Sequence, residues 1–347
     1  MIGRRTFISG TGAAVAAGAL FSPQSAEAGQ RRPGNRRKPR RIDTHAHVVP
    51  DFYDKWLKDL GLTAGGLAIP AWSAEAHLEL NERIGVETSI LSVSTPQVEP
   101  AKSVEEGRKW ARRLNEFCAE LADQHPGRFG FFATVTLPDV PGAIAEAEYA
   151  LDTLKADGVV LLANCKGTYL GDKAFDPLIA ALHEHNAVVF VHPSDLPAEP
   201  VPGLPAYGVD FLLDTTRAGL NMAKNGWLDR YSNVKFILAH AGGFLPYAAA
   251  RMARLATASG DQKAGLESLR RFYFDTALSS PTGLPSLVDF AAPGHITFGS
   301  DWPYANADRA ALFTGELDGY RDIDHDSVNR GAAEKLFPKY ARKHSRR

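Results

Sequence analysis

Four histidines and one aspartate have the residue types and the spacing of a metal site. His45 and His47 form an HxH pair, and His192, His240 and Asp301 each follow an apolar, strand-like run. Alternate side chains of a strand share one face, so the pair can bind one ion together. Imidazole and carboxylate groups are the usual ligands of zinc and similar ions. A single histidine after a strand is usually an ordinary polar residue. Here all five residues lie at the ends of strand-like runs, and this shared position favours a metal centre.

The elements that must position these residues alternate between strand-like and helix-like segments. The segments read as strands are 41–45, 86–93, 129–137, 158–163, 187–192, 234–240, 272–277 and 295–300. Several are continuous apolar runs, as in parallel strands that are covered on both faces. Amphipathic segments such as 103–123 and 140–155 lie between them, and Asp139 and Pro141 mark a helix start. The pattern predicts a single (β/α)8 TIM barrel, in which the carboxyl ends of all strands face one site.

A doubly wound sheet is the alternative fold, but it does not predict ligands after the first, fifth, sixth and eighth strands. No glycine-rich phosphate motif follows the first strand either. Two departures from a minimal barrel are expected, since long connections follow the first and fifth strands, at 47–86 and 192–234. Within the first connection, 52–60 and 73–84 read as helices. Long loops at this end of a barrel commonly form lids or substrate walls.

The N-terminus has the features of an export signal. Arg4-Arg5 precedes a small, apolar stretch, and Ala26-Glu27-Ala28 is a typical cleavage site. We therefore expect export by the twin-arginine route to the periplasm or the medium. The expected division of the chain is a signal peptide at 1–28, a basic linker at 29–40 and the metal-dependent barrel at 41–347.

Composition and charge bound the remaining possibilities. The chain has 347 residues, of which 44% are hydrophobic and 23% charged, an ordinary globular composition. A net charge of −1 argues against a nucleic-acid surface, and no apolar stretch is long enough for a membrane span in the mature form. The cysteines, Cys118 and Cys165, are expected to be unpaired, and they form no zinc motif.

Motifs surround each of the candidate site residues. They are Asp43-Thr44-His45-Ala46-His47, Val191-His192-Pro193, Ala239-His240-Ala241-Gly242-Gly243 and Gly299-Ser300-Asp301-Trp302-Pro303. Together they resemble the amidohydrolase superfamily, specifically amidohydrolase-related family 2 and its aminocarboxymuconate-semialdehyde decarboxylase-like branch. The segments 69–73 and 162–172 are further similar to the 6-methylsalicylate and orsellinate decarboxylases of that branch.

The resemblance implies that His45, His47, His192 and Asp301 hold one divalent ion, normally Zn²⁺, with Mn²⁺ as an alternative. It implies that His240 handles a proton beside the ion, and that the protein is a homodimer or a larger homo-oligomer. Asp275, at the end of the seventh strand, is a candidate partner of a metal ligand.

One lysine position and one arginine position distinguish this chain from some relatives. Binuclear members of the superfamily carry a carboxylated lysine at the fourth strand, whereas Lys166 reads as a loop residue, so one ion is expected. Some relatives hold a substrate carboxylate with an arginine between the first two strands. Arg83 falls late on a helix and is not a convincing equivalent, which argues against a dicarboxylate substrate.

The predicted activity is nonoxidative decarboxylation of a small aromatic or unsaturated acid, such as the 2-hydroxybenzoate 6-methylsalicylate. The carboxylate and the adjacent phenol oxygen would chelate the ion, and Asp301 or His240 would deliver a proton to the ring carbon. A metal-dependent hydrolase of a lactone or cyclic amide is the alternative, and an inactive metal-binding protein a third possibility.

Aromatic and polar residues near the motifs are candidate substrate contacts. Core packing is the plainer account of Trp72 and Trp302, whereas loop hydrogen bonding accounts for Asn164 and Tyr169 equally well. The candidates are Trp72, Asn164, Tyr169 and Trp302.

Overall fold

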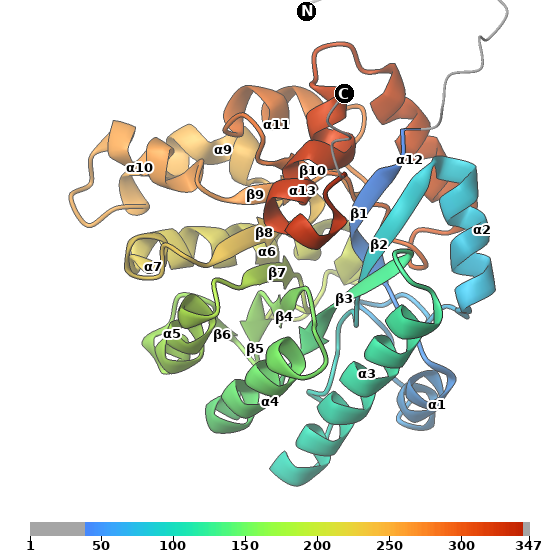
Figure 1. Cartoon of the computed structure of the whole chain (residues 1–347). Helices are drawn as coiled ribbons and strands as arrows, with labels where there is room; N and C mark the ends of the chain where they lie inside the picture. The colour runs from blue at the N-terminus through green and yellow to red at the C-terminus, as the bar shows by residue number, and fades with distance from the viewer. Residues whose placement is uncertain (1–38, 343–347) are drawn as a thin grey trace, which may run out of the picture. The chain divides into compact units, whose positions relative to one another are not determined.

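Eight parallel strands form one sheet in the order β1-β2-β3-β4-β7-β8-β9-β10 (Figure 1). They are β1 (Arg41–His47), β2 (Val86–Ser92), β3 (Phe129–Thr134), β4 (Gly158–Leu162), β7 (Val188–His192), β8 (Lys235–Leu238), β9 (Tyr273–Asp275) and β10 (Ile296–Thr297). A parallel bridge between Asp43 and Phe298, just after β10, joins the last strand to the first. The computed structural model describes residues 39–342, and there the predicted (β/α)8 barrel is confirmed, with each predicted strand present.

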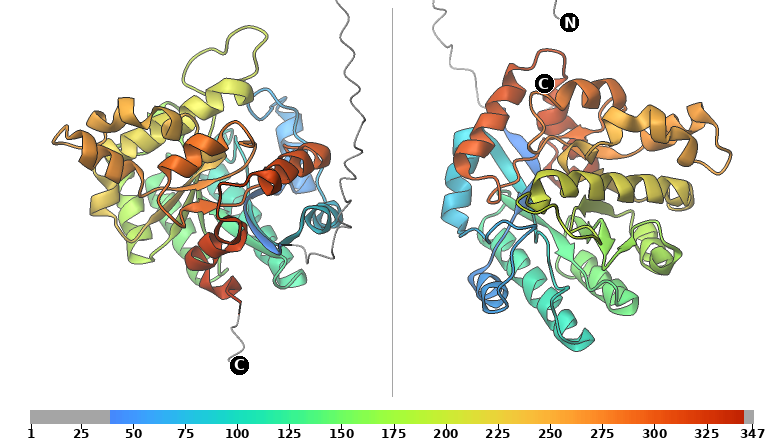
Figure 2. Two further views of the ribbon diagram at one scale, coloured as in Figure 1. Left: turned by 90° about the horizontal axis from the view of Figure 1, so that it is seen from above. Right: turned by 180° about the vertical axis from the view of Figure 1, so that it is seen from behind.

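Helices lie around the outside of the strands (Figure 1, Figure 2). They are α1 (Asp51–Asp59), α2 (Ala74–Ile84), α3 (Val104–Gln124), α4 (Val140–Asp152), α5 (Asp176–Glu184), α6 (Ala206–Lys224), α7 (Trp227–Arg230), α8 (Ala239–Gly242), α9 (Leu245–Met252), α10 (Gln262–Leu269), α11 (Leu284–Phe290), α12 (Ala307–Gly319) and α13 (Ala332–Leu336). A small antiparallel hairpin, β5 (Asn164–Cys165) with β6 (Thr168–Tyr169), follows β4 and was not predicted.

Side-chain caps explain where several of these helices begin. Ser73 accepts a hydrogen bond from a backbone N–H in the first turn of α2, and Ser103 does so for α3. Asp139 caps α4 in the same way, with Pro141 in the first turn, as the sequence predicted. At its other end α2 stops at Gly85, whose φ of 71° favours glycine.

Alternating side chains divide the core into an inner and an outer part. Val188 and Phe190 of β7 pack inside the barrel, whereas Val189 and Val191 pack outward against the helices. Phe337, just after α13, joins the inner cluster. His192 continues the inward-facing series of β7, so the alternation itself directs this side chain into the barrel.

A register shift in β1 sets the direction of the HxH pair. Ile42 packs inside the barrel, but Ala46 packs outside, although regular alternation would put both on one face. The pairing of β1 with β2 shifts between Asp43 and Ala46. Such an irregularity turns the following side chains to the other face. His45 and His47, on either side of Ala46, consequently face the interior.

The two ends of the barrel differ in their loops. The long yellow-green loop between β7 and α6 projects on the side opposite the last helices (Figure 2, left).

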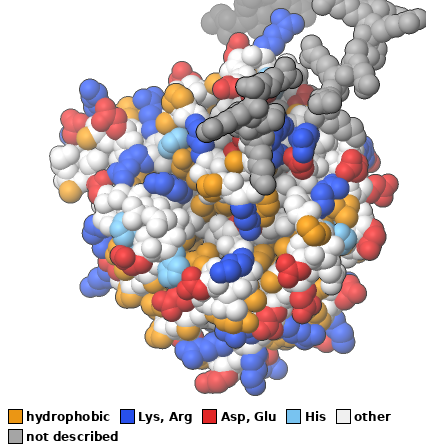
Figure 3. Space-filling model, viewed as in Figure 1, with side chains coloured by type: hydrophobic (Ala, Val, Ile, Leu, Met, Phe, Trp, Pro, Cys, Tyr) orange, Lys and Arg blue, Asp and Glu red, His pale blue; other side chains and the backbone are white. Residues whose placement is uncertain are grey.

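Basic and acidic side chains are interspersed on the face seen in Figure 3. No helix among residues 39–342 has the length and apolar character to cross a membrane. Cys118 and Cys165 are buried and unpaired, as predicted. The predicted signal peptide lies outside the described residues.

Candidate metal centre

The candidate residues meet at the carboxyl ends of the strands, where His192, His240 and Asp301 line a cavity. His45 and His47 come from β1, and His192 is the last residue of β7. His240 lies in the short α8 that directly follows β8, and Asp301 comes shortly after β10. His45 and His47 are fully buried, and the other three side chains are nearly so. The predicted convergence of distant residues on one point is therefore what the structure contains.

Four of these residues present donor atoms close enough to surround a single ion. The donor atoms of His45, His47, His192 and Asp301 all lie within 4.8 Å of one another. Oδ1 of Asp301 is 3.3 Å from Nε2 of His45 and 3.2 Å from Nε2 of His47. The two Nε2 atoms are 3.2 Å apart. Three imidazoles and a carboxylate at such separations fit a divalent cation with a position open for substrate.

The other ring nitrogen of each histidine is already engaged, which leaves Nε2 free to bind metal. Each Nδ1–H donates to a nearby oxygen: His45 to Oδ2 of Asp275 (2.8 Å), His47 to Oγ of Ser92 (2.9 Å) and His192 to the main-chain oxygen of Pro193 (2.8 Å). The acceptors fix both the tautomer and the ring orientation. Asp275 thus has the supporting position that the sequence indicated.

The charges at the site also fit a cation. Burial alone would raise the pKa of Asp301, but hydrogen bonds from His240 and His45 hold it well below its ordinary value. Burial lowers the pKa of His47 and lowers that of His192 well below the usual range. An ionised carboxylate and neutral imidazoles at His47 and His192 are the protonation states that metal binding requires. His45 differs, because the carboxylates of Asp275 and Asp301 outweigh burial and raise its pKa to about 10, so this imidazole would release a proton when an ion binds.

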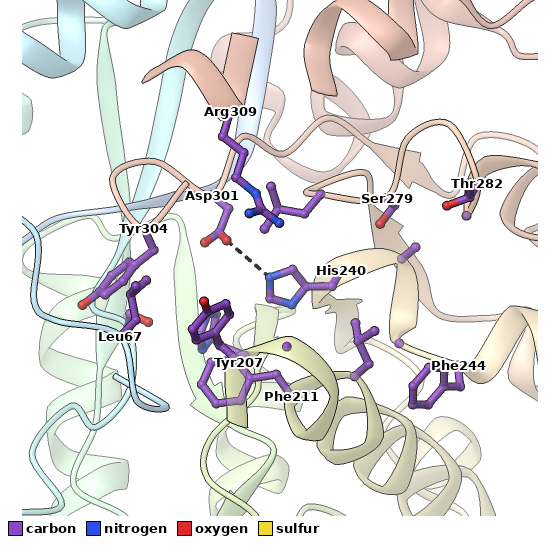
Figure 4. A pocket seen from close by; sticks show the side chains of 18 of the residues that line it. Leu67, Tyr207, Phe211, His240, Phe244, Ser279, Thr282, Asp301, Tyr304 and Arg309 are labelled. Carbon is purple, nitrogen blue, oxygen red and sulfur yellow. Dashed lines mark ion pairs between the residues drawn. The ribbon is translucent and has the colours of Figure 1, made fainter. Parts of the chain in front are cut away.

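His240 is held in an unusual backbone conformation beside this cluster. Its φ and ψ are 52° and 54°, in the left-handed region that non-glycine residues rarely adopt. Its N–H donates to Oδ1 of Asp275 at 3.0 Å, which helps to hold the turn. Nε2 of His240 lies 3.6 Å from Oδ2 of Asp301 (Figure 4), and Nδ1 has no hydrogen-bond partner among the described residues. Strain of this kind is typical of functional sites.

The glycines after His240 are explained by the same turn. Gly243 has a φ of 65°, and a Cβ there would lie 2.0 Å from the main-chain oxygen of Leu212. Only glycine fits this close approach of α6. The Gly242-Gly243 pair in the sequence motif therefore keeps the chain tight behind His240.

A cavity of about 550 Å³ opens above the donor cluster. This volume is in the range of small-molecule sites. Aromatic and aliphatic side chains form much of its wall, and the hydroxyls of Ser279 and Thr282 and the guanidinium of Arg309 also line it (Figure 4). The labelled wall residues are Leu67, Tyr207, Phe211, Phe244, Ser279, Thr282, Tyr304 and Arg309. The cavity suits a flat, partly apolar ligand.

The predicted substrate contacts Trp72 and Trp302 do not line this cavity. Both side chains are partly buried against the outer core, and Nε1 of Trp72 donates to Nδ1 of His77 at 3.1 Å. Trp302 supports the site through its backbone, because its carbonyl accepts from the N–H of His47. The plainer account, core packing, thus describes these two residues.

Asn164 and Tyr169 are also absent from the cavity wall. They lie on the β5–β6 hairpin, where Nδ2 of Asn164 donates to Oδ1 of Asp214 at 2.9 Å. The hydroxyl of Tyr169 accepts from Arg217 at 3.3 Å. Both side chains therefore bond to residues of α6, and their contact with substrate stays a prediction. Lys166 is exposed on the same hairpin.

Several wall residues were missed in the sequence. Tyr207 and Phe211 stand one helical turn apart on α6, a spacing that reads as an ordinary core face. Tyr304 and Arg309 follow Asp301 closely in the sequence. Because the segments after barrel strands build the site, this position could have identified them as wall residues.

Comparisons with known proteins agree with this geometry. An amidohydrolase family model matches residues 42–339. The chain is 39% identical over 316 residues to a 6-methylsalicylic acid decarboxylase from Penicillium expansum, covering 86% of this chain and 96% of that protein. A solved amidohydrolase II is similar with a TM-score of 0.80 and 28% identity, over 86% of this chain and 99% of that one. A dihydroxybenzoic acid decarboxylase from Polaromonas sp. JS666, solved with manganese and the inhibitor 2-nitroresorcinol, has a TM-score of 0.72 and 21% identity, over 88% and 99%.

Proposed function

The chain belongs to the amidohydrolase family, and from this premise we propose that it is a metal-dependent, nonoxidative carboxy-lyase. The proposed reaction releases CO2 from a small aromatic acid with a hydroxyl next to the carboxylate, such as 6-methylsalicylate. The observation that carries the proposal is the cluster of His45, His47, His192 and Asp301, of which His192 and Asp301 line an aromatic-walled cavity. The relation to a 6-methylsalicylic acid decarboxylase supports the same chemistry.

The four clustered residues would hold one divalent ion, for which we propose Zn²⁺, with Mn²⁺ as the alternative. Histidine-rich donor sets suit zinc, and manganese accompanies the similar Polaromonas structure. When bound, such an ion would act as a Lewis acid on the carboxylate and phenol oxygens of the substrate. Metal analysis of the purified protein distinguishes the two ions.

The remaining residues would bind the ring and move a proton. Tyr207, Phe211 and Tyr304 offer apolar faces to an aromatic ring, where ring–ring contacts add about 0.5–1.5 kcal/mol beyond burial. Nε2 of His240 and Oδ2 of Asp301 lie 3.6 Å apart, slightly more than a hydrogen bond, so a small approach of the two side chains would allow a proton to pass between them. One proton goes to the ring carbon that bears the carboxylate. The carbon–carboxylate bond then breaks, its electron pair restores the aromatic ring, and CO2 leaves.

Turnover in deuterated water tests the proposal. We expect one deuterium on the ring carbon that lost CO2, and no reaction with 4-hydroxybenzoate, in which hydroxyl and carboxylate cannot chelate one ion. Release of CO2 without deuterium at that carbon would contradict the proton-delivery step. Rapid hydrolysis of a lactone or cyclic amide, with no CO2 from any hydroxybenzoate, would instead support the alternative hydrolase.

We extend the proposal to the cellular setting of the enzyme. The motif at Arg4-Arg5 supports export of the folded, metal-loaded protein by the twin-arginine route. Assembly into a homodimer or larger homo-oligomer stays a prediction from the family resemblance, and size-exclusion chromatography with light scattering measures it.

A further inference from the structure

Arg309 is the only lysine or arginine among the described residues that line the cavity. It lies in the first turn of α12 (Ala307–Gly319), and its guanidinium extends toward Asp301 and His240 (Figure 4). The arginine therefore stands over the part of the cavity where the reaction is proposed to occur.

The guanidinium of Arg309 has no carboxylate partner among residues 39–342. Asp308, its neighbour in sequence, pairs instead with Arg83, whose Nη1 lies 2.9 Å from Oδ1 of Asp308. The Arg309 side chain lies over the ring of Phe313, with 5.6 Å from Cζ to the ring centroid. The backbone N–H of Arg309 donates to Oδ1 of Asn306. Asn306 thereby caps α12 and fixes the turn from which the Arg309 side chain extends. The cavity thus contains an unpaired cation on a fixed backbone.

The cavity is also larger than a simple hydroxybenzoate requires. A volume of 550 Å³ corresponds to about 18 water-sized groups, whereas 6-methylsalicylate has about 11 non-hydrogen atoms. Hydroxyl groups of Ser279 and Thr282 lie on the side away from Tyr304 (Figure 4). There is room, and there are polar groups, for a substituent beyond the carboxylate and the adjacent phenol.

We propose that Arg309 binds a second carboxylate of the substrate, and hence that, among aromatic acids with a hydroxyl next to the carboxylate, hydroxybenzene dicarboxylates are preferred over monocarboxylates such as 6-methylsalicylate. A planar guanidinium without a partner matches a carboxylate with paired hydrogen bonds. This inference rests on the proposed function and names its substrate class. It also revises the sequence-based argument against a dicarboxylate, which considered only Arg83. The structure places Arg83 in an exposed ion pair and supplies an arginine from a different element.

The test compares 2-hydroxybenzoate with derivatives that carry a second ring carboxylate, in the metal-loaded wild type and in Arg309→Met, Arg309→Lys and Arg83→Met. We expect kcat/KM of the wild type to favour one dicarboxylate over 2-hydroxybenzoate by about 10- to 100-fold, the usual scale for a charge-assisted hydrogen bond. Arg309→Met should abolish this preference, Arg309→Lys should keep part of it, and Arg83→Met should keep all of it. Because Arg309 is exposed, these substitutions should leave the fold intact.

A binding measurement separates this inference from the proposed function. Calorimetric titration with benzoate and with benzenedicarboxylates requires no turnover, and the same preference and the same loss in Arg309→Met are expected. If no hydroxybenzoate releases CO2 but the binding preference appears, the decarboxylase proposal fails and the anion site stands. Equal binding of both compounds, or an equal loss for both in Arg309→Met, would place Arg309 on the shared carboxylate or outside the site and overturn the inference.

Discussion

Replacement of Asp275 by asparagine should weaken metal binding although the residue is not itself a ligand in the proposed centre. Oδ2 of Asp275 accepts from Nδ1 of His45 at 2.8 Å. Oδ1 accepts from the backbone N–H of His240 at 3.0 Å and of Ala277 at 2.9 Å. Both carboxylate oxygens are therefore acceptors, and all three partners are donors.

An asparagine at this position cannot satisfy the same partners in either orientation. With its oxygen on the two backbone N–H groups, its NH2 faces Nδ1–H of His45. Relief of that clash would move the ring proton to Nε2, the nitrogen that must bind metal. In the opposite orientation the NH2 faces the backbone N–H groups of His240 and Ala277. Loss of such a supporting partner typically reduces metal affinity 10- to 100-fold, or about 1.4–2.7 kcal/mol.

Ser92→Ala provides a matched control. It removes the Oγ that accepts from Nδ1 of His47 at 2.9 Å, but the main-chain oxygen of Ser92 remains 3.3 Å from that nitrogen. We expect a loss of less than about tenfold, because one acceptor survives. Competition with a chelator at neutral pH measures both affinities, and denaturant unfolding of the metal-free proteins checks the fold. Wild-type affinity in Asp275→Asn, together with a weakened Ser92→Ala, would refute the reasoning.

Three further predictions concern the site, the pH dependence of stability and the N-terminus. His192→Ala should lose metal, whereas His240→Asn should keep most of it and lose turnover by roughly a hundredfold or more, as for a positioned acid–base group; a metal-free His240→Asn protein would make His240 a ligand. Burial raises the pKa of Asp214 to about 6. The protonated carboxyl of Asp214 therefore adds on the order of 3 kcal/mol to the free energy of unfolding below about pH 4, and this contribution is lost as pH rises through about 6. Asp214→Asn should flatten the denaturation profile between these values, and an unchanged slope would contradict the assignment. Changing both Arg4 and Arg5 to lysine should leave precursor in the cytoplasm, as cell fractionation would show, and unaltered export would argue against the twin-arginine route.

The positions of the strands were predictable because parallel barrel strands are apolar on both faces. The predicted run 187–192 became β7 at Val188–His192, and 158–163 became β4 at Gly158–Leu162. Strand ends were predicted less well: the segment 234–240 ends as a strand at Leu238, because His240 adopts a left-handed conformation. An apolar run does not encode that turn, although the two glycines after His240 indicate it.

The donor cluster was predictable for a different reason from the cavity walls. A residue directly after a strand has a position that the fold determines, so His192 and Asp301 needed only the barrel. Tyr207 and Phe211 lie on α6, after a long loop, and their direction depends on where that loop returns the chain. The hairpin that holds Asn164 was not predicted, because its two-residue strand is too short to leave a periodic signal.

Closure of the barrel links the two ends of the chain and makes the order of synthesis important. Asp43 accepts from the N–H of Ser300 across 257 residues, and Phe298 provides the bridge that covers the free edge of β1. A chain interrupted before this segment has an open sheet edge, which promotes aggregation. It also lacks Asp301 and therefore the only carboxylate of the donor cluster. A centre with all four donors therefore cannot form until synthesis has passed Asp301, so binding of an ion would distinguish chains that can close the barrel from shorter ones.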